Sequence, residues 1–160
     1  MTEPLLQLRD LKTWFGNSDR PVRAVDGVSF DLLPGETLAV LGESGCGKSI
    51  TALSIMRLVP EPAGRIISGS IRFNGEELLA KPEVAMREVR GSKIAMIFQE
   101  PMTSLNPVIT VGEQIGESLE LHLGMTGDAR QKRVVELLEQ VGIPDPAARA
   151  GEYPHNCREE

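Results

Sequence analysis

The residues best able to do chemistry form one short run, Gly42-Glu-Ser-Gly-Cys-Gly-Lys-Ser49. The run matches G-x-x-x-x-G-K-[ST], a pattern whose backbone N–H groups surround the phosphates of a nucleotide. Its glycines allow torsion angles that other residues avoid, so successive N–H groups can form a concave nest for an anion. Lys48 can then reach the terminal phosphates, and the Ser49 hydroxyl can ligate Mg²⁺. The motif therefore predicts a site for a triphosphate with Mg²⁺.

The chain around this motif has the strand–loop–helix order that a phosphate-binding loop requires. The apolar run Thr37–Leu41 predicts a buried strand before it, and Ser49–Val59 has helical apolar spacing after it. A helix that begins at the loop turns its positive dipole end toward the phosphates. Cys46 has two interpretations, a small residue between two glycines or a thiol sensitive to modification. We assign these residues to the nucleotide site, the last through its backbone N–H alone: Gly42, Glu43, Ser44, Gly45, Cys46, Gly47, Lys48, Ser49 and Ile50.

A second candidate site follows another apolar run. Ile94–Phe98 predicts a second buried strand, and it ends in Gln99 rather than in an aspartate. The Gln99 amide oxygen can ligate Mg²⁺ or hold a water, while the segment after it can move with the state of the nucleotide. The alternative is a polar residue that only caps the strand.

The remaining elements indicate a mixed α/β chain. Leu5–Leu33 predicts extended structure, and Arg65–Phe73 predicts a strand that ends in the Asn74-Gly75 turn. Capping-box spacing of Thr110 and Glu113 predicts the start of a helix. Two further helices and a terminal loop are expected at Pro82–Arg90, Asp128–Val141 and Ile143–Glu160. The second of these helices carries an apolar stripe of Val134, Val135, Leu137, Leu138 and Val141.

Composition excludes several classes of function. The 160 residues carry 17 Lys and Arg against 23 Asp and Glu, a net charge of −6, and only 4% aromatic residues. Nucleic-acid binders usually have a basic excess and aromatic platforms, so we expect no nucleic-acid partner. No apolar run approaches the roughly 18–20 residues of a membrane-spanning helix. The 2 cysteines are too few for a disulfide framework, which favours the cytoplasm.

Together these segments resemble the ATP-binding subunits of ABC transporters, most of all those of the oligopeptide and dipeptide (peptide/nickel) import type. The resemblance extends from about Leu5 to His155. It rests on Ala24–Phe30, on the loop Gly42–Ser49, and on the run Ala95-Met-Ile-Phe-Gln-Glu-Pro-Met-Thr-Ser-Leu-Asn-Pro107. The part of this run after Gln99 is more specific to peptide importers than the loop is.

The resemblance implies roles for individual residues. Gln99 matches the glutamine that senses Mg²⁺ and the membrane subunit, so Lys48 and Gln99 are the implied catalytic residues and Ser49 and Gln99 the implied metal ligands. Phe15 falls at the aromatic position that stacks on adenine, while neighbouring Trp14 is the alternative stacking residue. Phe15 can also be a core or turn aromatic. The implied cofactors are ATP and Mg²⁺.

The implied fold is α/β, a P-loop NTPase (RecA-like) core of an ABC ATPase. It has an N-terminal antiparallel β layer and the start of an α-helical subdomain, with the C-terminal half missing. We expect one nucleotide-binding domain, in its N-terminal part, over residues 1–160. Within it we expect the β layer at about 1–35 and 65–75, the P-loop core at 36–100, a partial helical subdomain at 101–150 and a divergent tail at 151–160.

The resemblance also predicts parts that this sequence lacks. After Tyr153-Pro-His155 it expects a Leu-Ser-Gly-Gly signature, then an Asp–Glu pair and a switch histidine, but Asn156-Cys-Arg-Glu-Glu160 follows. We expect a truncated chain that binds nucleotide at best and does not hydrolyse it alone. Two other functions stay open: a non-catalytic fragment that binds nucleotide or the permease, and a different P-loop enzyme such as a small kinase.

By the same resemblance, the expected activity is MgATP-driven uptake of oligopeptides, dipeptides or a related solute such as nickel. The implied partners are transmembrane permease subunits, docked at Gln99–Leu123, and a second ATP-binding subunit that is identical or related. A solute-binding protein takes part indirectly. The expected location is peripheral, on the cytoplasmic face of the inner cell membrane.

Overall fold

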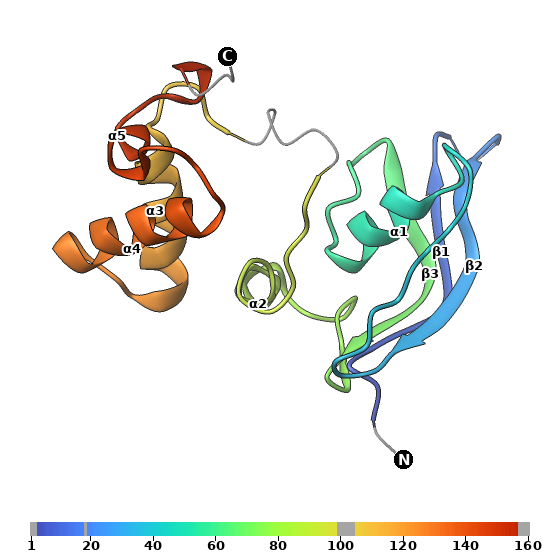
Figure 1. Cartoon of the computed structure of the whole chain (residues 1–160). Coiled ribbons are helices and arrows are strands. Elements are labelled where there is room, and N and C mark those ends of the chain that lie inside the picture. Colours follow the sequence, from blue (N-terminus) through green and yellow to red (C-terminus); the bar gives the residue numbers. More distant parts are fainter. Residues whose placement is uncertain (1–2, 18, 99–104, 157–160) are drawn as a thin grey trace. The chain divides into compact units, whose positions relative to one another are not determined.

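The computed structural model describes residues 3–17, 19–98 and 105–156. The chain divides into two compact units, Met1–Ile94 and Ala95–Glu160. Each unit buries a hydrophobic cluster of its own. The phosphate-loop motif lies wholly within the first unit, so the geometry of the candidate nucleotide site depends on the packing of that unit (Figure 1).

An antiparallel sheet forms much of the first unit. Its strands are β1 (Leu6–Phe15), β2 (Val22–Leu32), β3 (Gly64–Phe73) and β4 (Glu76–Glu77), and they lie in the order β2-β1-β3-β4. Every neighbouring pair is antiparallel. Asn74 and Gly75 connect the last two strands with φ of 49° and 78°, torsions that a tight hairpin turn needs. The extended segments and the turn expected from the sequence are confirmed.

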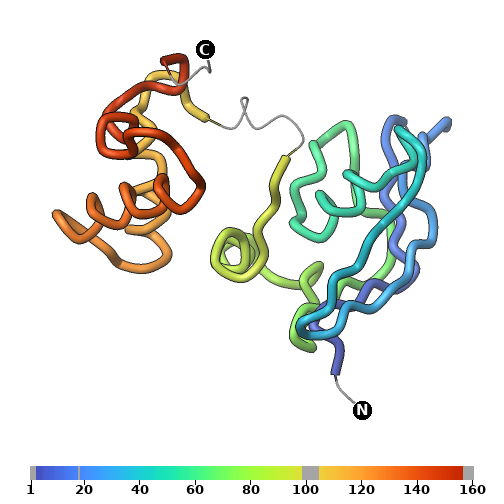
Figure 2. The backbone as a smooth tube through the Cα atoms, in the orientation of Figure 1, coloured from blue at the N-terminus to red at the C-terminus, as the bar shows by residue number. Residues whose placement is uncertain are grey.

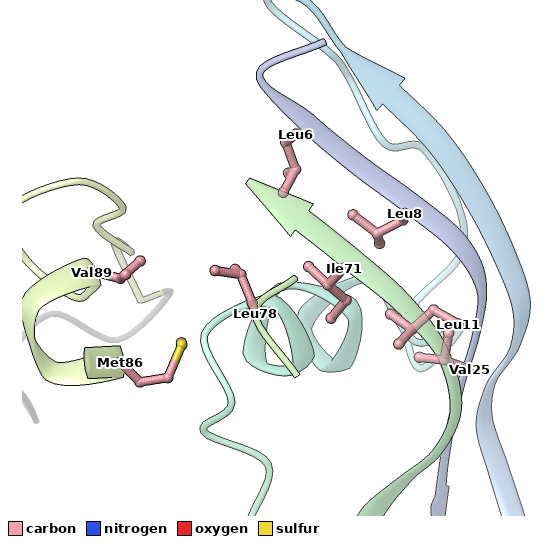
Figure 3. Packing of buried hydrophobic residues seen from close by; sticks show 8 residues of the cluster. All are labelled: Leu6, Leu8, Leu11, Val25, Ile71, Leu78, Met86 and Val89. Carbon is pink, nitrogen blue, oxygen red and sulfur yellow. The ribbon is translucent and has the colours of Figure 1, made fainter. Parts of the chain in front are cut away.

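The core of the first unit lies on one face of this sheet. Successive side chains of a strand point to opposite faces, so alternate residues of β1 enter the core, with a register shift between Leu8 and Leu11. Leu78 lies between Ile71 of the sheet and Met86 of α2 (Glu83–Val89), which joins this helix to the same core (Figure 3). The buried members are Leu6, Leu8, Leu11, Val25, Ile71, Leu78, Met86 and Val89.

Helix α1 (Lys48–Ile55) follows the phosphate loop and ends earlier than the expected Val59. The cause is Arg57, whose left-handed φ of 52° cannot continue a right-handed helix. Arg90, at the end of α2, donates from its Nε to the Met56 carbonyl at 2.7 Å. This bond caps the C-terminal end of α1 with a positive charge. The expected helix therefore has the right position but the wrong length. Its end depends on the conformation of Arg57 and on the contact with Arg90, which is distant in the sequence.

The two buried strands expected at Thr37–Leu41 and Ile94–Phe98 are wrong. Neither run is a strand, apart from an isolated bridge between Arg90 and Ile94, and Leu41 and Ile97 are 90% and 95% exposed. A strand needs neighbours to pair its backbone N–H and C=O groups. No strand within the described ranges pairs with either run, so their apolar composition alone does not bring about burial.

The second unit is built from helices, as the tube in Figure 2 shows. They are α3 (Val111–Leu123), α4 (Gly127–Gln140), α5 (Pro146–Ala150) and a 3-10 turn, η2 (Pro154–Asn156). Leu119, Val134 and Leu138 form the buried cluster between α3 and α4. Thr110 and Glu113 form the expected capping box, so both long helices are confirmed.

Two details of the second unit correct the sequence analysis. The segment expected as loop contains α5 and η2, because Pro146 stands at the first turn of α5, a position that suits its fixed φ. Val141, expected in the apolar stripe of α4, lies past the end of that helix and is 73% exposed. Among the described residues, no helix combines the length and the apolar character needed to cross a bilayer.

The β3–β4 hairpin depends on an acidic side chain, which makes the stability of the first unit sensitive to pH. The Glu77 carboxylate accepts hydrogen bonds from the Ser70 hydroxyl and from the N–H groups of Ile71 (2.9 Å) and Leu79 (3.2 Å). Burial raises the pKa of this carboxyl, but these bonds and the nearby Arg72 lower it more, so its pKa lies below the ordinary 4.5.

A carboxylate with a lowered pKa stabilises the fold above its unfolded pKa, and the stabilisation is lost as the pH falls through the folded pKa. We predict that the free energy of unfolding falls as the pH drops below 4.5, and that Glu77→Gln makes this fall smaller. Urea denaturation over the acidic range measures it. Glu88→Gln, at an exposed position of α2, is the control and keeps the wild-type pH dependence. An identical pH dependence in wild type and Glu77→Gln contradicts the prediction.

Candidate phosphate-binding site

The glycine-rich motif forms a tight loop that opens directly into α1. Gly45 and Gly47 have left-handed φ of 80° and 91°, and Gly47 is the residue that caps the helix. Within the loop, the Cys46 N–H donates to the Glu43 carbonyl at 3.3 Å, and the Thr51 N–H then donates to the Gly47 carbonyl at 2.9 Å. The chain therefore closes on itself and enters the helix without an intervening linker.

Lys48 turns its ammonium group back into this loop. Its Nζ donates to the carbonyl oxygens of Gly42 and Glu43, both at 2.7 Å, and lies 3.5 Å from the Cys46 Sγ. The Lys48 ammonium therefore lies inside the glycine-rich loop, next to the N-terminal end of α1. The full charge of the lysine and the partial positive charge of the helix end both favour an anion at this point.

The first turn of α1 supplies further donors. The first N–H groups of a helix have no acceptor within the helix, and no acidic residue stands in this first turn. Ser49 is exposed, so its hydroxyl can meet a ligand, whereas the Ile50 side chain packs against the hydrophobic core. Ile50 can therefore offer only its backbone N–H. Glu43, Ser44, Gly45 and Cys46 are all exposed.

The loop is seated against a bulge in β2. Thr13 pairs with Val25 whereas Trp14 pairs with Arg23, so Ala24 is an extra residue in the register. Its carbonyl oxygen would lie 2.1 Å from a Cβ placed on Gly47. Only a residue without a side chain allows this approach, and it fixes the end of the loop against the sheet.

Phe15 and Trp14 lie on opposite faces of β1. Phe15 shares the face of Thr13, whose hydroxyl contacts Ser54 of α1, and its ring packs so closely on Gly64 that a Cβ there would lie 2.5 Å from its Cε1. Trp14 instead stacks with Arg23, whose guanidinium carbon is 4.9 Å from the ring centre. Phe15 is thus the ring on the side of the phosphate-loop helix. The role of either ring toward a base stays a prediction.

Gln99, the expected second site, lies outside the described residues. Its roles as metal ligand and catalytic residue therefore stay predictions. Among the described residues, no group of three or more His, Cys, Asp and Glu side chains could hold a metal ion. Ser49 is the remaining expected ligand, and a cation that accompanies phosphates needs few protein ligands because phosphate oxygens and water supply the others.

Sequence reasoning missed a polar pair in the core beneath the site. The hydroxyls of Thr13 and Ser54 are 2.8 Å apart, and both residues are 0% exposed. The available signal was weak: each is a small polar residue at a core-facing position of an apolar pattern, Thr13 in β1 and Ser54 in α1. Without the tertiary structure, nothing pairs them across 41 residues.

A loop with this motif, which opens into a helix and holds its lysine inward, is typical of a P-loop NTPase. The family model described as ABC transporter matches residues 25–157. The chain belongs to this family.

Curated relatives match nearly the whole chain. The peptidoglycan transport ATP-binding protein YejF of Agrobacterium fabrum is 55% identical over 154 residues, which are 96% of this chain and 28% of the relative. A putative peptide import ATP-binding protein of Brucella ovis is 51% identical, over 96% of this chain and 47% of the relative. A probable peptide ABC transporter ATP-binding protein of Sinorhizobium fredii is 48% identical, over 94% and 45%. The chain thus spans less than half the length of each of these relatives.

Solved structures give the same fold. The ATP-binding cassette MJ0796, in a dimeric post-hydrolysis state bound to ADP and Pi, has a TM-score of 0.81 at 21% identity, over 96% of this chain and 63% of that one. The structure of cbiO1 from Clostridium perfringens, part of an ABC transporter complex, has a TM-score of 0.67 at 23% identity, over 98% and 56%. The fold is therefore part of an ABC ATPase fold, as expected.

The contact between the loop and β2 leads to a paired prediction. Gly47→Ala and Gly45→Ala both place a side chain at a left-handed position, which costs about 1–2 kcal/mol. Only the Gly47 variant also meets the Ala24 carbonyl, because nothing lies within 4 Å of a Cβ at Gly45. We expect Gly47→Ala to lower the free energy of unfolding by a further 1–3 kcal/mol or so, as overpacking does. Urea denaturation measures the free energy of unfolding of both variants. Equal losses in the two would contradict the close contact between Gly47 and the Ala24 carbonyl.

Proposed function

We propose that this chain is the nucleotide-binding part of the ATP-binding subunit of an ABC importer for oligopeptides, dipeptides or a related solute. The observation that carries the proposal is the position of the Lys48 ammonium, 2.7 Å from two loop carbonyls at the start of α1. A cation already placed inside an exposed loop of backbone is prepared to exchange carbonyl oxygens for phosphate oxygens.

The triphosphate of MgATP is the ligand that fits this loop. Lys48, the N–H groups of the loop and the first turn of α1 bind its phosphates. Ser49 and Gln99 are the proposed ligands of Mg²⁺, which spreads the negative charge of the phosphates when it is bound. Phe15 is the proposed platform for the adenine, because it lies on the face of the sheet that α1 covers, whereas Trp14 lies on the other face.

Two sequence similarities support the proposed solute. The part of the run Ala95–Pro107 that follows Gln99 resembles peptide importers more specifically than the phosphate loop does. The Brucella and Sinorhizobium relatives, at 51% and 48% identity, carry peptide import or peptide transport in their names. Peptides are therefore favoured, while nickel and other small solutes remain the alternative class.

The proposed partners are the permease subunits, and the second unit offers a surface for them. Gln114 of α3 binds the backbone of Asn106 twice, accepting from its N–H at 2.8 Å and donating to its carbonyl at 2.9 Å. This carboxamide fixes the loop beside Leu105. Together with Ile115 and Leu137, these residues line a hollow of about 570 Å³. With a second ATP-binding subunit, and indirectly a solute-binding protein, the assembly belongs at the cytoplasmic face of the inner membrane.

The 160-residue chain by itself is proposed to bind nucleotide without turning it over. In this family the attacking water is polarised by a glutamate that follows a Leu-Ser-Gly-Gly signature, and these 160 residues contain no such signature. Without that glutamate, ATP hydrolysis has no group to polarise the attacking water. The positive charges that bind the phosphates remain. For the chain alone, this proposal is the same as the second candidate function, a non-catalytic module that binds nucleotide or the permease.

The nucleotide site is tested by calorimetric titration of the chain with MgATP. We expect saturable binding and a thermal stabilisation of about 2.7 kcal/mol at a hundredfold excess over the dissociation constant. Lys48→Ala is expected to weaken binding by about 2 kcal/mol or more, because it removes a charge-assisted contact to phosphate. Lys93→Ala, a lysine outside the loop, is the matched control and retains binding.

The same two proteins test turnover. Phosphate release from MgATP by the wild-type chain is expected to equal that of Lys48→Ala. Release well above that background would show that the chain hydrolyses ATP unaided. An absence of MgATP binding to the folded wild type would remove the proposed function itself.

The docking surface is tested by co-purification with the permease subunits of the same transporter. Leu105→Ala combined with Asn106→Ala is expected to weaken association about tenfold, the effect of losing a central interface contact. Val84→Ala, at a 71% exposed position of α2 outside both the hollow and the expected docking segment, is the control and leaves recovery unchanged. Unchanged recovery of the double variant counts against this surface.

A further inference from the structure

We propose that Thr13 and Ser54 are positioning residues that hold the base-binding strand at a set place against the phosphate-binding helix. The inference rests on the proposed nucleotide site. It adds a contact that fixes the proposed base platform on β1 relative to the phosphate donors on α1. Thr13 belongs to β1 and Ser54 to α1, and both are completely buried.

The hydroxyl pair has a defined direction. The Ser54 Oγ donates to the Ile50 carbonyl at 2.7 Å. A serine hydroxyl has a single hydrogen, so the 2.8 Å contact between the two hydroxyls is made by Thr13 donating to Ser54. The result is a short relay from the strand, through the helix side chain, to the backbone of the first turn of α1.

The two ends of this relay lead to the two proposed subsites. Thr13 is two residues before Phe15 on the same face of β1, so a shift of the strand at Thr13 moves the proposed base platform with it. Ile50 lies in the first turn of α1, beside Lys48 and Ser49. The relay therefore connects the strand of the base platform with the helix that carries the phosphate donors.

A second contact, at the other end of α1, acts together with the Thr13–Ser54 hydrogen bond to fix the position of the helix. Gly47, at the start of α1, touches the Ala24 carbonyl of β2, while Ser54 lies in the last turn of the helix. Contacts at both ends fix the direction of α1 on the sheet and prevent it from sliding along β1. Apolar contacts alone tolerate such sliding because they have no preferred direction, whereas a hydrogen bond requires a set distance and angle.

Burial makes the pair costly unless it is bonded. Transfer of a hydroxyl from water to an apolar interior costs free energy when the hydroxyl has no partner. Replacing both partners by apolar groups of the same shape can be nearly neutral for stability. A valine and an alanine would serve the hydrophobic core equally well. The pair therefore adds orientation to this interface more than it adds stability.

The test compares two ligands on the full chain by calorimetric titration, MgATP and magnesium tripolyphosphate, which lacks the base. Thr13→Val removes the hydroxyl and keeps the shape of the side chain. We expect it to bind MgATP about tenfold more weakly, the size expected for one lost buried hydrogen bond, and tripolyphosphate within about twofold of wild type. Thr13→Ser restores the hydroxyl and is expected to restore MgATP affinity.

Two further variants make the comparison decisive. Phe15→Ala removes the platform itself and is expected to reproduce the pattern of Thr13→Val, with MgATP weakened and tripolyphosphate unchanged. Thr37→Val, at an exposed threonine of the same unit, is the matched control and retains wild-type affinity for both ligands. Ser54→Ala removes the acceptor from the helix side and gives the same selective loss, which provides an answer even where Thr13→Val does not fold.

Each result decides the matter. Equal weakening of both ligands by Thr13→Val and Ser54→Ala means that the hydroxyls act through stability alone, and it overturns the inference while the nucleotide site stands. Unchanged affinity for MgATP overturns it as well. A wild-type chain that binds neither ligand overturns the proposed nucleotide site and this inference with it.

Discussion

The seating of α1 on the antiparallel sheet is the contact on which the rest of the first unit depends. At one end, Gly47 accepts the close approach of the Ala24 carbonyl because it has no side chain. At the other end, Arg90 binds the carbonyl of Met56 with a charged side chain. Between them, the helix carries the loop whose lysine lies among backbone carbonyls. A phosphate site of this kind is therefore a consequence of how one short helix is held, because its donors are mostly backbone groups with a direction set by the helix.

The chemistry of the loop and the packing behind it make opposite demands. Phosphate binding needs exposed backbone, little side-chain bulk and concentrated positive charge, none of which stabilises a fold. The structure offsets this by placing buried apolar residues of β1, β2 and β3 directly behind the helix, and by closing the β3–β4 hairpin around the carboxylate of Glu77. The polar contact of Thr13 and Ser54 is an exception within this apolar layer, and it lies where β1 meets α1.

Local signals predicted much of the chain because their physical cause is local. The capping box of Thr110 and Glu113, the Asn74-Gly75 turn and the start of α1 depend on neighbouring residues, and all were found where expected. The runs Thr37–Leu41 and Ile94–Phe98 failed because burial of a strand depends on partners from elsewhere in the chain. The predicted length of α1 was wrong because Arg57 has a left-handed φ that ends the helix, and Arg90, 34 residues from Met56, binds the carbonyl at that end.

The sequence by itself predicted the site, because the order of glycines, lysine and serine in 42–49 matches a phosphate loop, in which each residue type is needed for its own chemistry. It also determined the family through segments spread over most of the chain. Only the tertiary structure decided which aromatic ring shares the face of α1, because side chains alternate along β1 and the helix covers one face of the sheet. It also decided that Ala24 meets Gly47 and that Thr13 meets Ser54. These pairings arise from contacts between distant residues, which no local pattern encodes.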